Sequence, residues 1–201
     1  MGNPMLKQPL NLPSQEFEAH LYDCDGTLAD TMTPHIEAWV AECNAHGVPL
    51  DGNMITELAG MPAVPTVERI NARYGSKLDP HQIAQLKEDR FHREYLHRVK
   101  PIQEVVDVLE QAYAKGIKIG VVSGGRKRIV EETLKMLNIR DKVGVVICAE
   151  DVVNGKPHAE PFLKAAQALG VKPEKCLVFE DADLGIKSAE NANMQWVRVY
   201  S

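Results

Sequence analysis

The sequence predicts an α/β protein, built on a Rossmann-like parallel sheet with helices on both faces and interrupted by an inserted helical segment. Three observations lead to this fold class. From about residue 101 onward, amphipathic helical stretches alternate with short apolar runs rich in β-branched residues. Those runs are apolar almost throughout, as in parallel strands covered on both faces. Residues 33–100, in contrast, show helical periodicity and no convincing strand.

The α/β alternation predicts five strands and the helices between them. One strand stands alone near the N-terminus and four follow in the second half of the chain; the expected strands are 17–23, 117–123, 143–148, 176–179 and 195–200. Pro101 suits the first turn of the first core helix, and Gly116 suits its C-terminal cap. Further helices are expected from the apolar faces of 129–137 and 159–169 and around Ile186.

The segment at 33–100 is expected to form a helical bundle of its own. Its apolar residues recur at three- and four-residue spacing, as at Ile36, Trp39, Val40 and Cys43. Because the segment lies between the first strand and the α/β repeat, both of its ends must connect to one body. We therefore predict two domains, a core of residues 1–31 and 101–201 and a cap of residues 32–100. The connections between them, near 31–33 and 98–101, are expected to act as hinges.

Composition and charge exclude several classes of protein. The 201 residues are 44% hydrophobic and carry 23 basic against 28 acidic side chains, a formal net charge of −5. This balance argues against a partner such as nucleic acid, which needs a basic surface. No apolar run approaches the roughly 18 residues that a membrane span requires. An anionic small molecule would need a local metal ion or a few placed cations to offset the net charge.

The cysteines and the N-terminal stretch predict a cytoplasmic protein. Three prolines break the first fifteen residues, which lack the apolar centre and small-residue cleavage site of an export signal. The cysteines show no paired spacing, as expected for reduced, buried thiols; they are Cys24, Cys43, Cys148 and Cys176.

Two acidic pairs follow expected strands. Asp23 and Asp25 occur in the sequence DCDGT, where Gly26 permits a sharp turn, and Glu180 and Asp181 follow the fourth strand. Parallel sheets bind ligands beyond the carboxyl ends of their strands, so the two pairs would meet if strands one and four are neighbours. Carboxylates without sulfur or imidazole ligands suit a hard cation, and Mg²⁺ is the one expected. Taken alone, the first pair could be an acidic turn between a strand and a helix, and the second is more often a solvated loop.

Polar residues also follow the second and third strands. Ser123 precedes two glycines, so that its hydroxyl and the open backbone N–H groups around Gly124 could bind an anion at a helix start. Lys156 lies in a loop before a proline, where its charge could contact a phosphate. Arg126 is close enough to extend this anion site. Taken singly, these residues are an N-cap serine, a surface lysine and part of a solvated first helical turn.

In this order, the four motifs resemble the haloacid dehalogenase-like superfamily. The matching segments are 17–31 and 101–201, and they carry the DxDGT motif, the strand-end serine, the lysine before proline and the Glu-Asp pair. The second aspartate of DxDGT resembles the phosphotransferase branch, because dehalogenases lack it. The inserted helical segment resembles the small cap of the β-phosphoglucomutase-like and sugar-phosphatase subfamily.

This resemblance implies a phosphatase acting on a small phosphorylated metabolite, by default a sugar phosphate. Asp23 would be the nucleophile that becomes an aspartyl-phosphate, and Asp25 the general acid and base. Mg²⁺ would be held by Asp23, the backbone carbonyl of Asp25, Asp181 and, directly or through water, Glu180. The groups holding the phosphate would be Thr27, Ser123, Gly124, Lys156 and Arg126. The cap would close over the site and choose the substrate, and a monomer is the expected state.

Two further residues lie near the first motif and could take part in the chemistry. His35 matches a position at which members of this subfamily carry a histidine near the acid/base aspartate, although a histidine that opens a helix is commonly structural. Cys24 lacks the arginine that a cysteine phosphatase loop requires. Strand alternation also points Cys24 away from the aspartates, so it is interpreted as a buried apolar residue.

Two alternatives to a phosphatase stay open. A β-phosphoglucomutase-like mutase would need a cation in the cap loop to hold a second phosphate, and residues 58–66 contain none, the next being Arg69. A non-catalytic binding protein on this fold would leave the filled catalytic positions without a use. The cap residues that choose the substrate cannot be ranked from spacing; candidates are Arg69, Lys77, His92 and Arg93.

Overall fold

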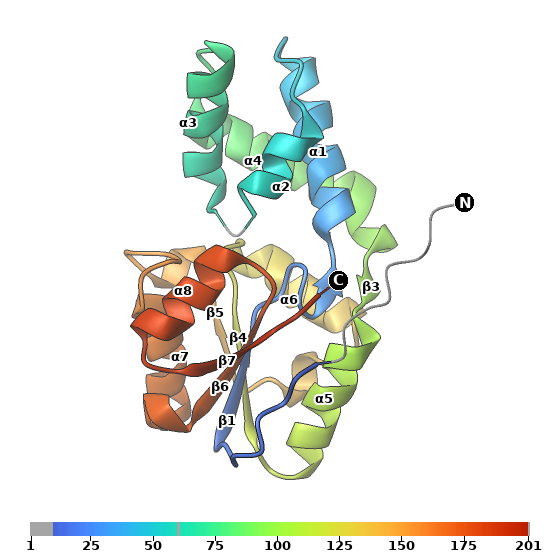
Figure 1. Cartoon of the computed structure of the whole chain (residues 1–201). Helices are drawn as coiled ribbons and strands as arrows, with labels where there is room; N and C mark the ends of the chain where they lie inside the picture. The colour runs from blue at the N-terminus through green and yellow to red at the C-terminus, as the bar shows by residue number, and fades with distance from the viewer. Residues whose placement is uncertain (1–9, 60, 201) are drawn as a thin grey trace, which may run out of the picture.

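A computed structural model describes residues 10–59 and 61–200, and its centre is one five-stranded parallel sheet (Figure 1). The strands are β1 (Ala19–Tyr22), β4 (Lys118–Val122), β5 (Val145–Ile147), β6 (Cys176–Glu180) and β7 (Gln195–Arg198). They lie in the order β5-β4-β1-β6-β7, and all neighbouring pairs are parallel. The predicted Rossmann-like α/β fold is confirmed, with strand ends that differ by up to two residues from those expected.

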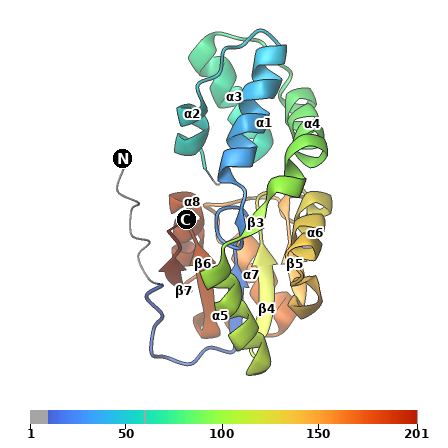
Figure 2. The same ribbon diagram turned by 90° about the vertical axis from the view of Figure 1, so that its right-hand side faces the viewer.

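Helices cover both faces of this sheet (Figures 1 and 2). One face packs against α5 (Gln103–Ala114) and α6 (Lys127–Met136), and the other against α7 (Glu160–Leu169) and α8 (Asp183–Asn191). Side chains of β1 alternate between the two cores, since Tyr22 belongs to the first and Leu21 to the second. Short 3₁₀ turns complete the connections; they are η3 (Arg140–Lys142), η4 (Ala149–Asp151) and η5 (Pro173–Lys175).

The start of α5 differs from the prediction. Pro101 is not a first-turn helical residue, because it lies in the two-residue strand β3 (Lys100–Pro101) and the helix begins at Gln103. A proline φ angle suits an extended strand as well as a helix start, so the sequence did not separate the two positions. At the other end, Gly116 adopts a φ of 77° just beyond the helix, which is the left-handed geometry of the predicted cap.

Four helices stand over the carboxyl ends of the strands (Figure 1). They are α1 (Met32–Ala45), α2 (Gly52–Glu57), α3 (Ala63–Tyr74) and α4 (Pro80–Arg90), and α4 continues into the π-helical turn η1 (Phe91–Tyr95) and the 3₁₀ turn η2 (Leu96–Arg98). They enclose a hydrophobic core of their own, which includes Trp39, Val67, Ile70 and Ile83. Within the described ranges, no helix is long and apolar enough to cross a membrane.

The two connections between the sheet and these four helices are paired with each other. Strand β2 (Ala29–Asp30) runs antiparallel to β3, with Ala29 opposite Pro101 and Asp30 opposite Lys100. Strand β3 lies below α1 (Figure 2). Sequence periodicity did not predict it, because two residues are too few to show the alternation of a strand.

The strand register brings three polar chain segments to one level. Tyr22 is aligned with Phe179 of β6 and with Val121 of β4, and the backbone N–H of Asp23 donates to the carbonyl of Phe179 at 3.0 Å. The first and fourth strands expected from the sequence correspond to β1 and β6, and this pairing confirms that they are neighbours. The residues that follow β1 and β4, and the last residue of β6, therefore lie together under the helices.

Candidate active site

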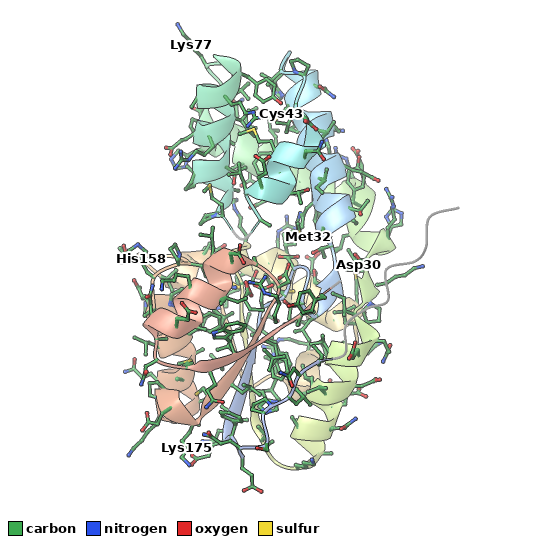
Figure 3. The ribbon with its side chains drawn as sticks, viewed as in Figure 1. Asp30, Met32, Cys43, Lys77, His158 and Lys175 are labelled. Carbon is green, nitrogen blue, oxygen red and sulfur yellow. The ribbon has the colours of Figure 1, made fainter. Side chains whose placement is uncertain are left out.

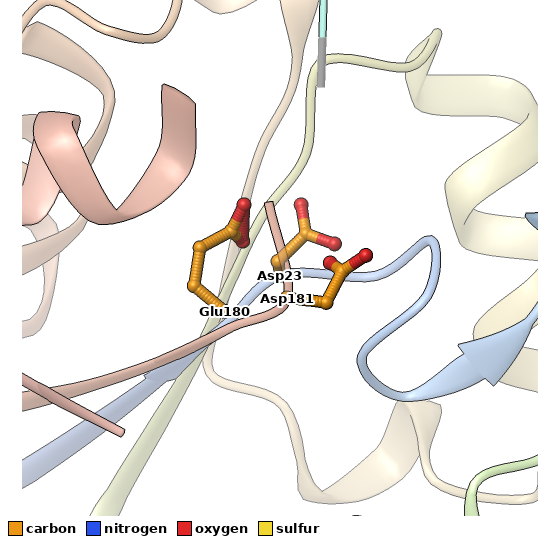
Figure 4. A group of neighbouring side chains, drawn as sticks. All are labelled: Asp23, Glu180 and Asp181. Carbon is orange, nitrogen blue, oxygen red and sulfur yellow. The ribbon is translucent and has the colours of Figure 1, made fainter. Parts of the chain in front are cut away.

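Three carboxylates meet where β1 and β6 end. Oxygen atoms of Asp23, Glu180 and Asp181 all lie within 4.8 Å of one another. Figure 4 shows their carboxylate groups gathered above the two strand ends. Glu180 and Asp23 are buried, being 1% and 6% exposed, and Asp181 is half-buried. A hard divalent cation is the group that such an all-oxygen cluster fits.

Two glycines leave the space that these carboxylates occupy. A Cβ atom on Gly185, in the first turn of α8, would lie 1.8 Å from Oε1 of Glu180. A Cβ on Gly26 would lie 2.3 Å from Oδ2 of Asp181, and Gly26 also needs its φ of 88° to turn the chain after the first motif. Both glycines are therefore required by the placement of the acidic groups.

Lys156 supplies a cation inside the same cluster. Its Nζ donates to Oδ1 of Asp23 at 2.6 Å and to Oε2 of Glu180 at 3.3 Å, and its side chain is 3% exposed. Burial opposes the charge of Lys156, but the two carboxylates outweigh it and raise the pKa of Lys156. The lysine expected to meet a phosphate is thus held in its charged form beside Asp23.

One lysine does not balance three carboxylates. Burial raises the pKa of Asp23 well above its usual range, with a further contribution from Glu180, while Lys156 opposes the shift. Burial likewise raises the pKa of Glu180 to about 7, against the effect of Lys156, and raises the pKa of Asp181. The residues present therefore fit a divalent cation, because its charge would relieve repulsion that Lys156 leaves in place.

Asp25 is held by a second set of partners. Nε2 of His35 lies 3.2 Å from its Oδ1, and the hydroxyl of Ser123 lies 3.5 Å from its Oδ2. Burial acts to raise the pKa of Asp25, but its contact with His35 and a hydrogen bond from Thr31 hold that pKa at about 2. Asp25 is therefore a carboxylate here, in the form that accepts a proton.

His35 is itself positioned by a lysine that the sequence analysis did not single out. Nζ of Lys87, on α4, lies 2.9 Å from Nδ1 of His35. Burial and the charge of Lys87 lower the pKa of His35 below its usual value, which favours a neutral imidazole. A signal for Lys87 was present in the sequence, since it lies between Ile83 and Phe91 on the buried face of its helix, where a lysine is unusual.

The hydroxyl groups at the strand ends bind protein atoms. Thr27 is fully buried, and its hydroxyl donates to Oδ1 of Asp181 at 3.1 Å, so it contacts the carboxylate cluster and does not line the pocket described below. The hydroxyl of Ser123 accepts a 3.0 Å hydrogen bond from the backbone N–H of Gly125. Ser123 and Gly124 both line the pocket, as expected for groups that would meet a phosphate.

Arg126 is paired with the helices above the sheet. Its Nε lies 2.6 Å from Oε2 of Glu88, and its Nη1 contacts the side-chain oxygen of Gln85. Both partners belong to α4. Arg126 lines the pocket, as expected from its spacing to Ser123, but an acidic residue that sequence reasoning missed already holds it.

A pocket separates the strand ends from the helices above them. Its floor includes Asp23, Asp25, Ser123, Lys156 and Asp181. Apolar side chains supply most of its roof; they are Met32, Trp39, Ile55, Leu58, Ala59, Met61, Ala63 and Phe91. The position of Met32 at the junction is visible in Figure 3.

The basic residues and histidine suggested as substrate selectors lie elsewhere. Arg69, Lys77, His92 and Arg93 are not among the residues that line the pocket. Lys77 projects from the far end of the helices (Figure 3), and His92 pairs with Glu132 at 2.5 Å. The four cysteines are free and buried, and burial raises the pKa of Cys24, which agrees with its interpretation as an apolar core residue.

The fold and the site define a class of protein: an α/β enzyme with a carboxylate-rich centre at the ends of its parallel strands, covered by a helical insertion. Residues 20–199 match the model of the family described as haloacid dehalogenase-like hydrolase. The chain belongs to this hydrolase family, as the motifs predicted.

Three known proteins illustrate the relationship. The chain is 32% identical to "Fructose-1-phosphate phosphatase YqaB" of Escherichia coli strain K12, over 92% of this chain and 97% of that protein. It is 29% identical to "Beta-phosphoglucomutase" of Bacillus subtilis strain 168, over 89% and 81% of the two chains. The crystal structure of β-phosphoglucomutase from Clostridium difficile superimposes with a TM-score of 0.77 at 28% identity, covering 90% of this chain and 83% of that one.

Proposed function

We propose that the chain is a Mg²⁺-dependent phosphatase that hydrolyses a small sugar phosphate through an aspartyl-phosphate on Asp23. The observation that carries this proposal is the convergence of Asp23, Lys156, Glu180 and Asp181 at the floor of one pocket. The family supplies the hydrolase class, and the relative named as a fructose-1-phosphate phosphatase supports a phosphorylated sugar as the substrate.

The carboxylate cluster would hold the metal ion. Asp23 and Asp181 would be ligands, with the backbone carbonyl of Asp25 and with Glu180 acting directly or through water. When bound, Mg²⁺ would supply the positive charge that lets an anionic phosphoryl group approach these carboxylates. Lys156 would share that task, since its ammonium already lies 2.6 Å from Asp23.

The first chemical step would transfer the phosphoryl group to the protein. A carboxylate oxygen of Asp23 attacks phosphorus, and the bond from phosphorus to the leaving sugar oxygen breaks. The leaving oxygen takes a proton from Asp25. Asp25 must be protonated for this step, and the negative charge of the arriving phosphate would raise its pKa toward that state. Ser123 and Gly124 would contact the phosphoryl oxygens.

The second step would return the free enzyme. Asp25, now a carboxylate, accepts a proton from water as the water oxygen attacks phosphorus. The bond between phosphorus and Asp23 breaks, and inorganic phosphate leaves. His35 would keep Asp25 in place during both steps, through the hydrogen bond at 3.2 Å.

We propose that residues 32–100 act as a cap domain over a core of residues 1–31 and 101–201. Support comes from the separate hydrophobic core of α1–α4 and from the mixed lining of the pocket, which draws on both parts. An apolar roof would exclude water from the phosphoryl group and leave limited room for the sugar. In the described part of the loop 58–66, no basic side chain lines the pocket, which favours hydrolysis over mutase chemistry.

Phosphate release from fructose 1-phosphate tests this function. The wild-type chain should release phosphate with Mg²⁺ and not with a chelator, and Asp23→Asn should lose at least about a thousandfold in kcat/KM, as expected for loss of a nucleophile. Asp30→Asn, at an exposed position outside the pocket, is the matched control. Activity that survives in Asp23→Asn would rule out the aspartyl-phosphate route. Formation of glucose 6-phosphate from β-glucose 1-phosphate with glucose 1,6-bisphosphate would indicate a mutase.

A further inference from the structure

Glu88 is an acidic residue in the pocket that the proposed chemistry does not use. It lies on α4, its side chain is 13% exposed, and it lines the pocket together with Arg126. Its Oε2 is 2.6 Å from Nε of Arg126, yet among the described residues this buried oxygen has no hydrogen-bond donor aligned with it. The oxygen that faces Arg126 is therefore closed to solvent, and the carboxylate is committed to that arginine.

Every basic side chain in the described pocket lining has an established partner. Lys156 is bound to Asp23 and Glu180, and Lys87 lies against His35. The third basic side chain, Arg126, lies at the edge of the pocket between α6 and α4, and 39% of it is exposed. Without Glu88, an arginine at this place could bind a phosphate through two parallel N–H donors of its guanidinium group.

The charge of the described lining also bears on the substrate. Five carboxylates line the pocket against three basic side chains, an excess of two negative charges; the acids are Asp23, Asp25, Glu88, Glu180 and Asp181. A divalent cation would offset that excess, and one phosphate of the substrate would then occupy the floor. A second phosphate would lie near Glu88, and no cation without a carboxylate or histidine partner would be beside it. The free energy lost when that phosphate leaves water would therefore not be compensated.

We infer that Glu88 determines specificity: by pairing with Arg126 it withholds that arginine from a second phosphate, so that esters with an uncharged leaving group are favoured. The preferred substrates are therefore monophosphates, and bisphosphates are disfavoured. This inference rests on the proposed function, which supplies the phosphate ester at the floor.

The test compares two esters that share one reacting phosphate. Fructose 1-phosphate and fructose 1,6-bisphosphate differ only in the second phosphate, so the ratio of their kcat/KM values isolates the effect of that group. In Glu88→Gln, which keeps the size of the side chain and removes its charge, the bisphosphate to monophosphate ratio should rise about tenfold or more. That factor corresponds to one charge-assisted hydrogen bond gained from the released Arg126.

Two further variants test whether the change in this ratio comes from the pair formed by Glu88 and Arg126. Asp89→Asn removes the same charge one residue along α4, where Asp89 pairs with Arg128 outside the pocket lining, and it should leave the ratio unchanged. The double variant Glu88→Gln with Arg126→Gln should return the ratio to the wild-type value, because the released arginine is gone. A ratio in Glu88→Gln within about twofold of wild type, or an equal rise in Asp89→Asn, overturns the inference.

Binding measurements separate this inference from the proposed function. In an Asp23→Asn background, calorimetry with the two fructose esters reports discrimination without turnover, and adding Glu88→Gln should shift the ratio of the dissociation constants in the same direction. If the wild-type chain hydrolyses neither ester while binding shows the shift, the proposed function fails and the role of Glu88 stands. If turnover is found and neither ratio shifts, the role of Glu88 fails alone, and if no variant binds either ester, both fail.

Discussion

The ammonium of Lys87 lies 2.9 Å from Nδ1 of His35. An ammonium group only donates hydrogen bonds, so Nδ1 must accept, and the ring proton of a neutral His35 is then on Nε2, where it donates to Asp25 at 3.2 Å. Lys87 thus selects the tautomer that holds the proposed acid/base. A residue of the helical insertion thereby controls a group at the first motif, more than fifty positions earlier in the chain.

Replacing Lys87 should separate stability from activity. Burial lowers the pKa of Lys87 to about 8, so the charged form is costly in the fold at neutral pH, and Lys87→Met should raise the melting temperature. The same variant should lower kcat/KM by about tenfold, because His35 loses its fixed tautomer. Wild-type activity should fall as pH rises through about 8, and Lys87→Met should lack that limb. Lys77→Met, at the exposed far end of the helical insertion, is the control. An identical pH profile in both variants would contradict the proposed action of Lys87 on Asp25 through His35.

Gly185→Ala should lower activity although alanine favours helices. In a helix, alanine is more stable than glycine by about 1 kcal/mol. Here the new Cβ would lie 1.8 Å from Oε1 of Glu180 and 2.1 Å from its Cδ, so the carboxylate must move out of the cluster. We expect at least a tenfold rise in the Mg²⁺ concentration that gives half-maximal phosphate release. Lys187→Ala, on the exposed side of α8, controls for changes in the helix itself.

Thr27 should affect metal affinity through Asp181. Thr27→Val keeps the shape of the side chain and removes the 3.1 Å hydrogen bond to Oδ1 of Asp181. Loss of such an orienting bond is expected to weaken Mg²⁺ binding by about 10–100-fold. Thr27→Ser keeps the hydroxyl and should bind Mg²⁺ nearly as well as wild type, as titration of phosphate release with Mg²⁺ would show. Equal affinities in the valine and serine variants would mean that Thr27 has no such role.

The contribution of Glu180 to the stability of the metal-free protein should fall as pH rises. Burial raises the pKa of Glu180 from its ordinary value of 4.5 to about 7, so the folded state favours the protonated carboxyl more than the unfolded chain does. That contribution is complete below about pH 4.5 and is lost as pH rises through about 7. In a chelator, the melting temperature of the wild type relative to Glu180→Gln should therefore decline between pH 5 and pH 7.5. The comparison is needed because burial lowers the pKa of His20 to about 4, and the contribution of that histidine to stability rises over the same pH range. Mg²⁺ should restore stability mainly at the upper end, and a difference between the two proteins that does not change with pH would contradict the prediction.

The α/β body could be predicted from the sequence because its signals are local. Apolar strands followed by polar strand-end residues gave the sheet, and the pairing of β1 with β6 then brought Asp23 to Glu180 as expected. Thr27 and Arg126 were expected at the phosphate, but their contacts with Asp181 and Glu88 depend on how chain segments far apart in the sequence pack. No spacing rule encodes such contacts.

The contribution of α4 could not be assigned in advance for the same reason. Periodicity places Lys87 between Ile83 and Phe91 on the apolar face of its helix but gives no partner for its ammonium, and it assigns the neighbouring Glu88 to solvent. Both residues line the pocket because α1 packs against α4 within the hydrophobic core of the helical insertion. This packing turns the side of α4 that carries Lys87 and Glu88 toward the strand ends. The basic residues and histidine named as candidates for substrate choice, such as Lys77, lie on surfaces that this packing directs away from the pocket.

The antiparallel pairing of β2 with β3 makes the whole helical insertion the loop of one β-hairpin. Ala29 faces Pro101 and Asp30 faces Lys100, so the chain leaves and re-enters the body at adjacent points. A short turn could join those two strands without a change in the α/β sheet and its helices. A different insertion could also begin and end at the same residues. The helical insertion is thus a module: under the proposed function, the part that selects the substrate can be exchanged, by evolution or by grafting, while the folding unit that holds the strand-end carboxylates stays intact.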